Sequence, residues 1–109
     1  MSRKIEFFAT ISGRMPVSKF LKTLDDATLD KVFRVIDILA EYGPQTPQPY
    51  SKKLNRRISE LRVTGKNAVR LLYCQHDKKY VILHGFKKKS QKLPKKELDV
   101  AIKRSKYLD

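Results

Sequence analysis

Four polar side chains occupy alternate positions in three otherwise apolar segments of the second half of the chain. Glu60 and Arg62 lie in ISELRV, Arg70 in AVRLLY and His84 in VILHGF. Successive side chains of a strand point to opposite faces of a sheet, so these four can share one face. An arginine guanidinium matches phosphate oxygens, and histidine transfers protons near neutral pH. These residue types suit metal-free cleavage of RNA. That reaction needs a base for the 2′-hydroxyl, an acid for the leaving 5′-oxygen and fixed positive charge at phosphorus.

Each of these residues also has a structural interpretation. His84 could be a strand histidine that is hydrogen-bonded to a neighbouring carbonyl, and Arg62 and Arg70 could form cross-strand ion pairs with Glu60. Lysines follow His84 directly in the segment GFKKKSQK. They indicate either a solvated loop or a phosphate-binding edge, and the pattern alone leaves both open.

The charge of the chain lies almost entirely in its second half. The sequence has 109 residues and a net charge of +14, and residues 1–50 hold seven Lys or Arg against six Asp or Glu. Residues 51–109 hold eighteen against five. Such a field attracts nucleic acid, anionic lipid or an acidic protein.

Other kinds of site have little support. The single cysteine, Cys74, excludes an internal disulfide and a cysteine-based zinc cluster, and the four glycines are scattered singly. Cys74 and Tyr73 are expected in the core, and His76 in a surface turn. No apolar stretch approaches the ~20 residues that span a bilayer, and no signal peptide is evident, so we expect a cytosolic protein without cofactor or metal.

Hydrophobic periodicity predicts one α+β domain over residues 1–109. Asp25 or Asp26 is the expected N-cap of the longer N-terminal helix, which Gly43 and Pro44 end, and Pro94 opens the last helix. Leu61, Val63, Val69, Leu71, Tyr73, Val81 and Leu83 are expected on the helix-covered face of the sheet, with Leu72 and Ile82 among the polar residues opposite. The expected strands are 3–9, 57–63, 68–75 and 79–86, the expected helices are 17–24, 25–43 and 94–106, and 43–57 is an extended connector.

The order of these elements resembles the RelE/ParE superfamily of type II toxin–antitoxin toxins, and most of all its phage-derived, HigB-like branch. The similarity covers nearly the whole chain. Its most specific part is HGFKKKSQKLP followed by a basic helix that contains Glu97 and Ala101. The resemblance implies an antiparallel, twisted sheet with two N-terminal helices packed on one face and a C-terminal helix.

The resemblance also implies a function. RelE-like toxins cut messenger RNA in the ribosomal A site without a metal, through basic residues on the concave face of the sheet. Matching positions here make five residues candidates for catalysis: Arg62, Arg70, His84, Lys87 and Lys88. Seven others are candidates for holding RNA phosphates at the rim: Lys52, Lys53, Arg56, Arg57, Lys89, Lys92 and Lys95.

Two departures leave the general base unassigned. Glu60 stands where well-known ribosome-dependent members carry a lysine, and Lys92 and Leu93 stand near the place of a catalytic tyrosine in some members. The superfamily also includes ParE-like inhibitors of DNA gyrase, and a binding protein without catalysis is a third hypothesis. The expected partners are messenger RNA, the ribosome and a small helix-turn-helix antitoxin, with operator DNA bound only through the antitoxin complex, and no membrane.

Overall fold

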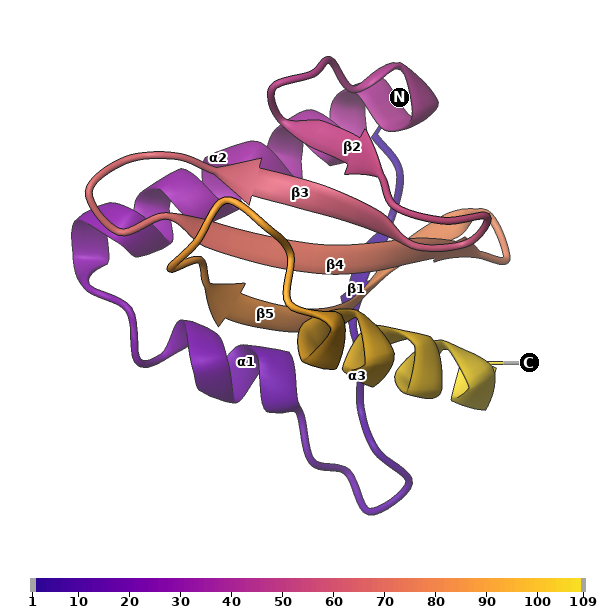
Figure 1. Ribbon diagram of the computed structural model, residues 1–109. Coiled ribbons are helices and arrows are strands. Elements are labelled where there is room, and N and C mark those ends of the chain that lie inside the picture. Colours follow the sequence, from indigo (N-terminus) through magenta and orange to yellow (C-terminus); the bar gives the residue numbers. More distant parts are fainter. Residues whose placement is uncertain (1, 109) are drawn as a thin grey trace.

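The computed structural model describes residues 2–108 as one sheet flanked by helices on both faces (Figure 1). Two helices and a 3-10 turn separate the first strand from the other four, and a helix and a second 3-10 turn end the chain. The elements in chain order are β1 Ile5–Phe7, α1 Pro16–Leu21, α2 Asp26–Tyr42, η1 Gly43–Gln45, β2 Ser51–Lys53, β3 Ser59–Val63, β4 Val69–His76, β5 Lys79–Lys87, α3 Lys95–Ser105 and η2 Lys106–Leu108.

The sheet has the order β1-β5-β4-β3-β2, and this confirms the predicted α+β class. Strands β2 to β5 form the expected antiparallel meander. β1 lies at the edge of the sheet next to β5 and pairs with it in parallel. Helices α1 and α2 connect β1 to β2 at the opposite edge, a long connection of the kind that parallel pairing needs. β2 falls inside the segment that was expected to be a connector.

Helix α2 begins and ends as its sequence predicts. The Asp25 carboxylate accepts the Thr28 backbone N–H at 2.9 Å, which makes Asp25 the N-cap. Hydrogen bonding from the Thr28 side chain, and then from its backbone N–H, lowers the pKa of Asp25. Gly43 ends the helix with a φ of 54°, a conformation that glycine adopts without strain.

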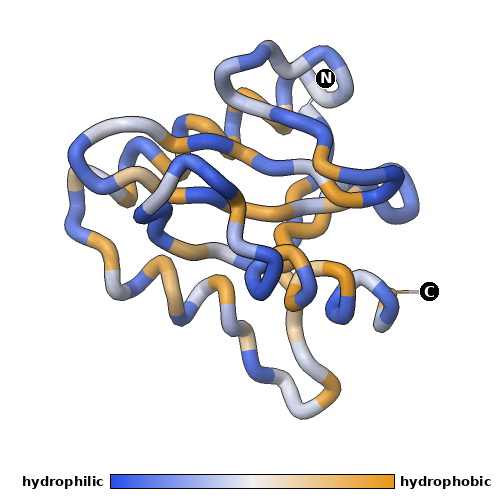
Figure 2. Tube along the Cα trace, in the orientation of Figure 1, coloured by the Kyte–Doolittle hydropathy of each residue, from blue (hydrophilic) through white to orange (hydrophobic). Residues whose placement is uncertain are grey.

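Apolar residues form two cores, one on each face of the sheet. Figure 2 shows hydrophobic residues distributed along the strands and the helices that supply these cores. The first core lies under α1 and α2 and includes Leu71, Tyr73 and Ile82. The second lies under α3 and includes Leu72 and Cys74, together with Val81, Leu83 and Ala101. The predicted placement of Tyr73 and Cys74 in the core is therefore confirmed.

The predicted faces were wrong for Val81, Leu83 and Ile82. Val81 and Leu83 lie in the α3-side core, and Ile82 lies on the side of α2. The cause is a β-bulge: Tyr73 pairs with Ile82 and Leu72 with His84, so that Leu83 has no partner of its own in the register. A bulge reverses the alternation of faces. It brings both Leu83 and His84 to the face that carries α3, and a strict alternation of faces could not foresee this.

Gly85 allows α1 to pack closely on β5. A Cβ atom at this position would lie 2.8 Å from Cδ2 of Phe20 and 2.9 Å from Cδ2 of Leu71. We expect Gly85→Ala to lower the free energy of unfolding by about 1–3 kcal/mol, because an extra methyl group overpacks the core. Urea denaturation measures the loss. Phe20→Leu should recover part of it in the double mutant, and a loss below about 0.5 kcal/mol would contradict the close packing.

Among the helices described, none combines the length and the apolar character needed to cross a membrane.

Candidate active site

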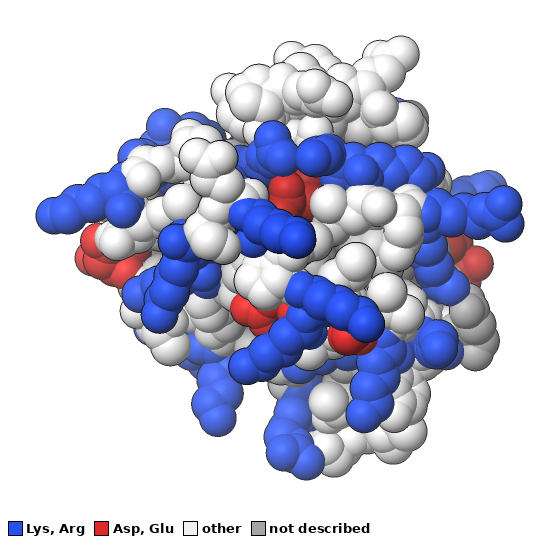
Figure 3. Space-filling view, in the orientation of Figure 1, with Lys and Arg blue, Asp and Glu red and all other residues white. Residues whose placement is uncertain are grey.

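Two arginines lie side by side on the face of the sheet that carries α3. Arg62 in β3 is paired in register with Arg70 in β4, so their side chains leave the sheet on the same face. Glu60 precedes Arg62 by two residues and therefore shares this face. The predicted placement of these three residues on one face of the sheet is confirmed. Figure 3 shows that lysine and arginine side chains gather over this face, with few acidic side chains among them.

Glu60 holds the two arginines together. It is 2% exposed, and its Oε1 accepts a hydrogen bond of 2.9 Å from Nε of Arg62. Its Oε2 lies 3.8 Å from Nε of Arg70. A buried carboxylate of this kind offsets the repulsion between two adjacent guanidinium groups and fixes their positions. Both interpretations of the sequence therefore hold in part, because the ion pairs exist and they also organise a cationic surface.

Arg70 has a hydrogen-bond donor without a protein acceptor. The residue is 8% exposed, and its Nη1 donates to the backbone carbonyl of Val69 at 3.1 Å. Its Nε is buried and has no hydrogen-bond partner among the described residues. Burial lowers the pKa of Arg70, Glu60 raises it and Arg62 lowers it, but a guanidinium remains charged at neutral pH. A buried and under-satisfied cation of this kind favours binding of an anion.

An open pocket of about 470 Å³ lies over the arginines. Its lining consists of Arg62, Arg70, Lys88, Lys89, Ser90 and Gln91. The segment after β5 forms one wall of the pocket, and the Lys88 backbone N–H holds it to the sheet by donating to the carbonyl of Ala68 at 3.0 Å. Strand residues thus supply the floor of the pocket, and the lysine-rich loop supplies its side.

Lys88 is the part of this pocket best suited to transfer a proton. Its pKa is lowered, first by burial and then by the positive charges of Arg70, Arg62 and Lys52, while Glu60 raises it. A lowered pKa makes an ammonium group a better proton donor. The charges of Arg70 and Arg62 therefore act on the Lys88 ammonium group.

His84 belongs to a different cluster, between β5 and α3. Its Nε2 lies 2.9 Å from Oε1 of Glu97, and its ring stacks on Phe86 with 5.6 Å between the ring centroids. Nη1 of Arg104 lies 3.4 Å from Nδ1 of His84 and donates to the carbonyl of Leu83 at 2.8 Å. His84 is not among the residues that line the arginine pocket.

These contacts determine which ring nitrogen of His84 carries the proton. A guanidinium can only donate, so Nδ1 of His84 is the acceptor from Arg104. Nε2 then carries the proton and donates a hydrogen bond to Oε1 of Glu97. Because both ring nitrogens have partners and Glu97 and Arg104 belong to α3, His84 links this helix to the sheet.

We expect His84→Ala to lower the free energy of unfolding by about 1–2 kcal/mol, because it leaves Glu97 and Arg104 without their shared partner in a half-buried place. Hydrogen exchange of α3 amides should rise more than that of α2 amides. Equal exchange in the two helices, with unchanged stability, would contradict this anchoring role. Lys96→Ala, on the exposed side of the same turn of α3, is the control.

The structure does not bring the other predicted cations to one place. Lys87 pairs with Val69, a residue of the α2-side core, so it lies on the opposite face, where its charge lowers the pKa of Asp25. Lys52 and Lys89 lie beside the arginine pocket. Lys52 also lines a separate cavity of about 620 Å³, together with Lys53, Arg56 and Arg57.

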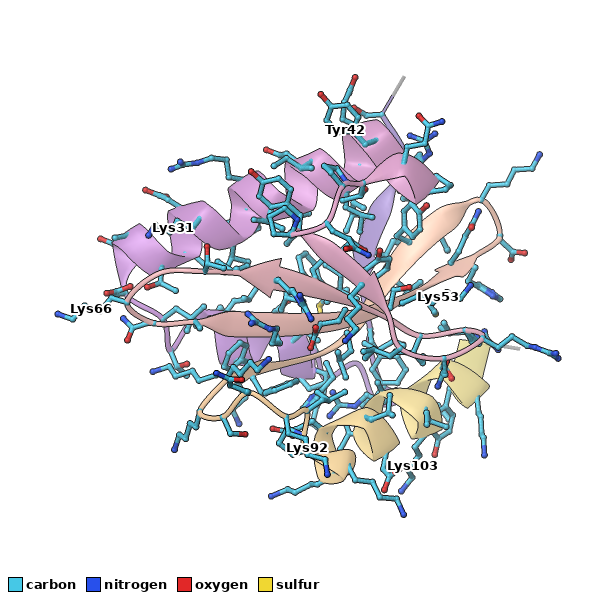
Figure 4. All side chains as sticks on the ribbon, turned by 45° about the horizontal axis from the view of Figure 1, so that its top comes forward. Lys31, Tyr42, Lys53, Lys66, Lys92 and Lys103 are labelled. Atoms are coloured by element: carbon cyan, nitrogen blue, oxygen red, sulfur yellow. The ribbon has the colours of Figure 1, made fainter. Side chains whose placement is uncertain are left out.

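Lys92 and Lys95 are exposed before and at the start of α3. Figure 4 shows Lys92 near the N-terminal end of this helix, with Lys103 further along it and Lys53 apart from both.

Sequence patterns missed several neighbours of these clusters. Glu97 and Arg104 were seen only as parts of a basic helix, although their spacing of seven residues places them on one side of α3. Their contact with His84 depends on how α3 packs against the sheet. Ser90 and Gln91 carry no signal of their own, since they line the pocket through the course of a loop.

The chain matches one protein-family model, described as "Phage derived protein Gp49-like (DUF891)", over residues 19–106. The matched segment runs from α1 to the end of α3 and includes every residue of the arginine pocket and of the His84 cluster. Comparison with curated protein sequences gave no match.

Proposed function

The chain belongs to the Gp49-like phage-derived family, a family of toxin–antitoxin toxins within the RelE/ParE-like superfamily, and we propose on this basis that it is a ribosome-dependent endoribonuclease. The observation that carries the proposal is the buried Arg70, whose Nε has no hydrogen-bond partner among the described residues, in an open pocket that also holds Arg62 and Lys88. An anionic phosphate is the ligand that such a pocket fits best.

The proposed reaction is an attack of the ribose 2′-oxygen on the adjacent phosphorus. The bond between O2′ and phosphorus forms, and the bond between phosphorus and O5′ breaks. Arg70 and Arg62 hold the non-bridging oxygens, where negative charge accumulates in the transition state. Nζ of Lys88 gives a proton to the leaving O5′. The products are a 2′,3′-cyclic phosphate and a 5′-hydroxyl.

The pocket lacks a group to take the proton from the 2′-hydroxyl. None of its six lining residues is a base at neutral pH, and Glu60 is engaged with the two arginines. His84 is engaged with Glu97 and Arg104. We infer that the ribosome supplies or positions this base. Because the pocket itself has no general base, cleavage depends on the ribosome.

Membership in a toxin–antitoxin family implies an antitoxin as a partner. We propose a small helix-turn-helix protein for this role, which would carry the complex to operator DNA. The net charge of +14 favours a partner with acidic surfaces.

Primer extension on a reporter message in a purified translation system tests the proposed function. New 5′ ends are expected only when both the protein and translating ribosomes are present. An intact message beside a protein that still arrests growth would contradict the proposal. That result would favour inhibition of gyrase.

A further inference from the structure

An apolar groove lies on the far side of α3 from the arginine pocket. Its volume is about 770 Å³, and its lining residues come from the segment that follows β1, the C-terminal half of α3 and η2. The groove shares no lining residue with the arginine pocket. Phe8, Ile11 and Val100 supply apolar walls together with Tyr107 and Leu108.

The walls of this groove include large apolar side chains that are exposed. Ile11 is 96% exposed and Tyr107 is 60% exposed. Tyr107 also packs near the buried Phe8, with 6.3 Å between their ring centroids, so its ring continues the α3-side core outward to the groove. Exposed apolar side chains that gather around one concavity mark an interaction surface.

Cations surround the groove. Lys103 and Arg104 belong to its lining, and none of its described lining residues is acidic. Arg14 lies at the same place, since its Nε donates to Oγ of Ser12, another lining residue, at 3.4 Å, and its backbone carbonyl accepts from Thr10. An apolar floor with a cationic margin is complementary to a segment that has apolar side chains on one side and carboxylates at its flanks.

We propose that this groove binds an acidic amphipathic segment of a partner protein, and that for a toxin of this family the partner is the antitoxin. The choice of the antitoxin rests on the proposed function, whereas the chemistry of the segment rests on the groove alone. Apolar side chains of the segment contact Phe8, Ile11 and Val100, and its carboxylates contact Lys103 and Arg14.

Arg104 contacts both the groove and the strand β5 that leads to the arginine pocket. It lines the groove, its guanidinium lies 5.7 Å from the Phe8 ring centroid, and it donates to Leu83 and His84 at the start of the segment that leads to Lys88. A carboxylate in the groove would compete for this guanidinium. Binding there should therefore alter the surroundings of the His84 ring although the segment does not cover Arg70.

Selection from a displayed library of random 16-residue peptides on the full-length chain tests the proposal. Enriched peptides should combine apolar residues with Asp and Glu. Ile11→Ser and Val100→Glu should weaken their binding about tenfold or more, which is the loss of one buried apolar contact. Phe33→Ser, at a 45% exposed phenylalanine on α2, should leave binding unchanged.

Nuclear magnetic resonance adds a readout that general charge attraction would not give. The bound peptide should shift the side-chain signals of Ile11 and Val100 and the ring signals of His84. Enrichment of basic peptides, no enrichment, or equal losses with Phe33→Ser would overturn the proposal. Self-association that Ile11→Ser abolishes would also overturn it in favour of a second copy. None of these measurements requires cleavage of RNA. The proposal for the groove can therefore be wrong while the proposed nuclease activity is right, and the reverse.

Discussion

Replacement of Arg70 by alanine is expected to reduce message cleavage about 100- to 1000-fold, the range measured when a single donor to a developing oxyanion is removed. Arg70 combines deep burial, a charge fixed by Glu60 and a position in the lining of an open pocket. Charge stabilisation by such a pre-positioned group is stronger than by a solvated one, because the group does not reorganise during the reaction. Toxicity on expression should disappear in parallel.

Three comparisons separate this chemistry from folding. Arg70→Lys should remain strongly impaired, since an ammonium cannot reproduce the planar fork of a guanidinium. Arg34→Ala removes an exposed arginine from α2 and should retain wild-type cleavage. Circular dichroism and the urea midpoint show whether each variant folds. A folded Arg70→Ala protein that cleaves within threefold of the wild-type rate would rule out the arginine pocket as the active site.

Replacement of Lys88 by alanine is expected to lower the cleavage rate about 100-fold, at the lower end of the contribution of a general acid. The pKa of Lys88 is lowered from 10.5, with burial as the first cause and neighbouring cations after it. An acid must carry its proton to react. The wild-type rate should therefore fall as the pH rises through the lowered pKa of Lys88, while the rate of Lys88→Ala should lack this fall.

Lys88→Arg and Lys89→Ala are the matched comparisons for this pH dependence. Arginine at position 88 keeps the charge but does not release a proton near that pH, so phosphate binding should persist while the alkaline fall disappears. Lys89 lines the same pocket and is exposed, so Lys89→Ala should mainly weaken binding and reduce its dependence on salt. An unchanged alkaline fall in Lys88→Arg would assign the proton to another group.

The strands and their polar residues could be predicted because they depend on local periodicity. Arg62 and Arg70 alternate with apolar neighbours, and the structure pairs them in register as the short turn between their strands requires. The cap at Asp25 and the stop at Gly43 are likewise local signals. These features needed no knowledge of distant contacts.

The parts that could not be predicted depend on tertiary structure. The bulge at Leu83 shows no sequence signal, yet it moves Val81 and Leu83 to the α3-side core and Ile82 to the α2-side core. His84 lies on the predicted face, but its contact with Glu97 depends on how α3 packs against the sheet. The opposite placement of Lys87 and Lys88 follows from one step of strand alternation at the end of β5. Because Lys87, Lys88 and Lys89 are adjacent in sequence, we predicted more lysines at the site than the structure places there.

The most direct test of the central claim is the chemistry of the cut ends. Message cut in a purified translation system should carry a 5′-hydroxyl, which polynucleotide kinase labels without prior phosphatase treatment, and a 2′,3′-cyclic phosphate on the other fragment. Both ends should be absent with Arg70→Ala. Cut ends that carry a 5′-phosphate would contradict attack by the 2′-oxygen, and with it the roles given to Arg62, Arg70 and Lys88.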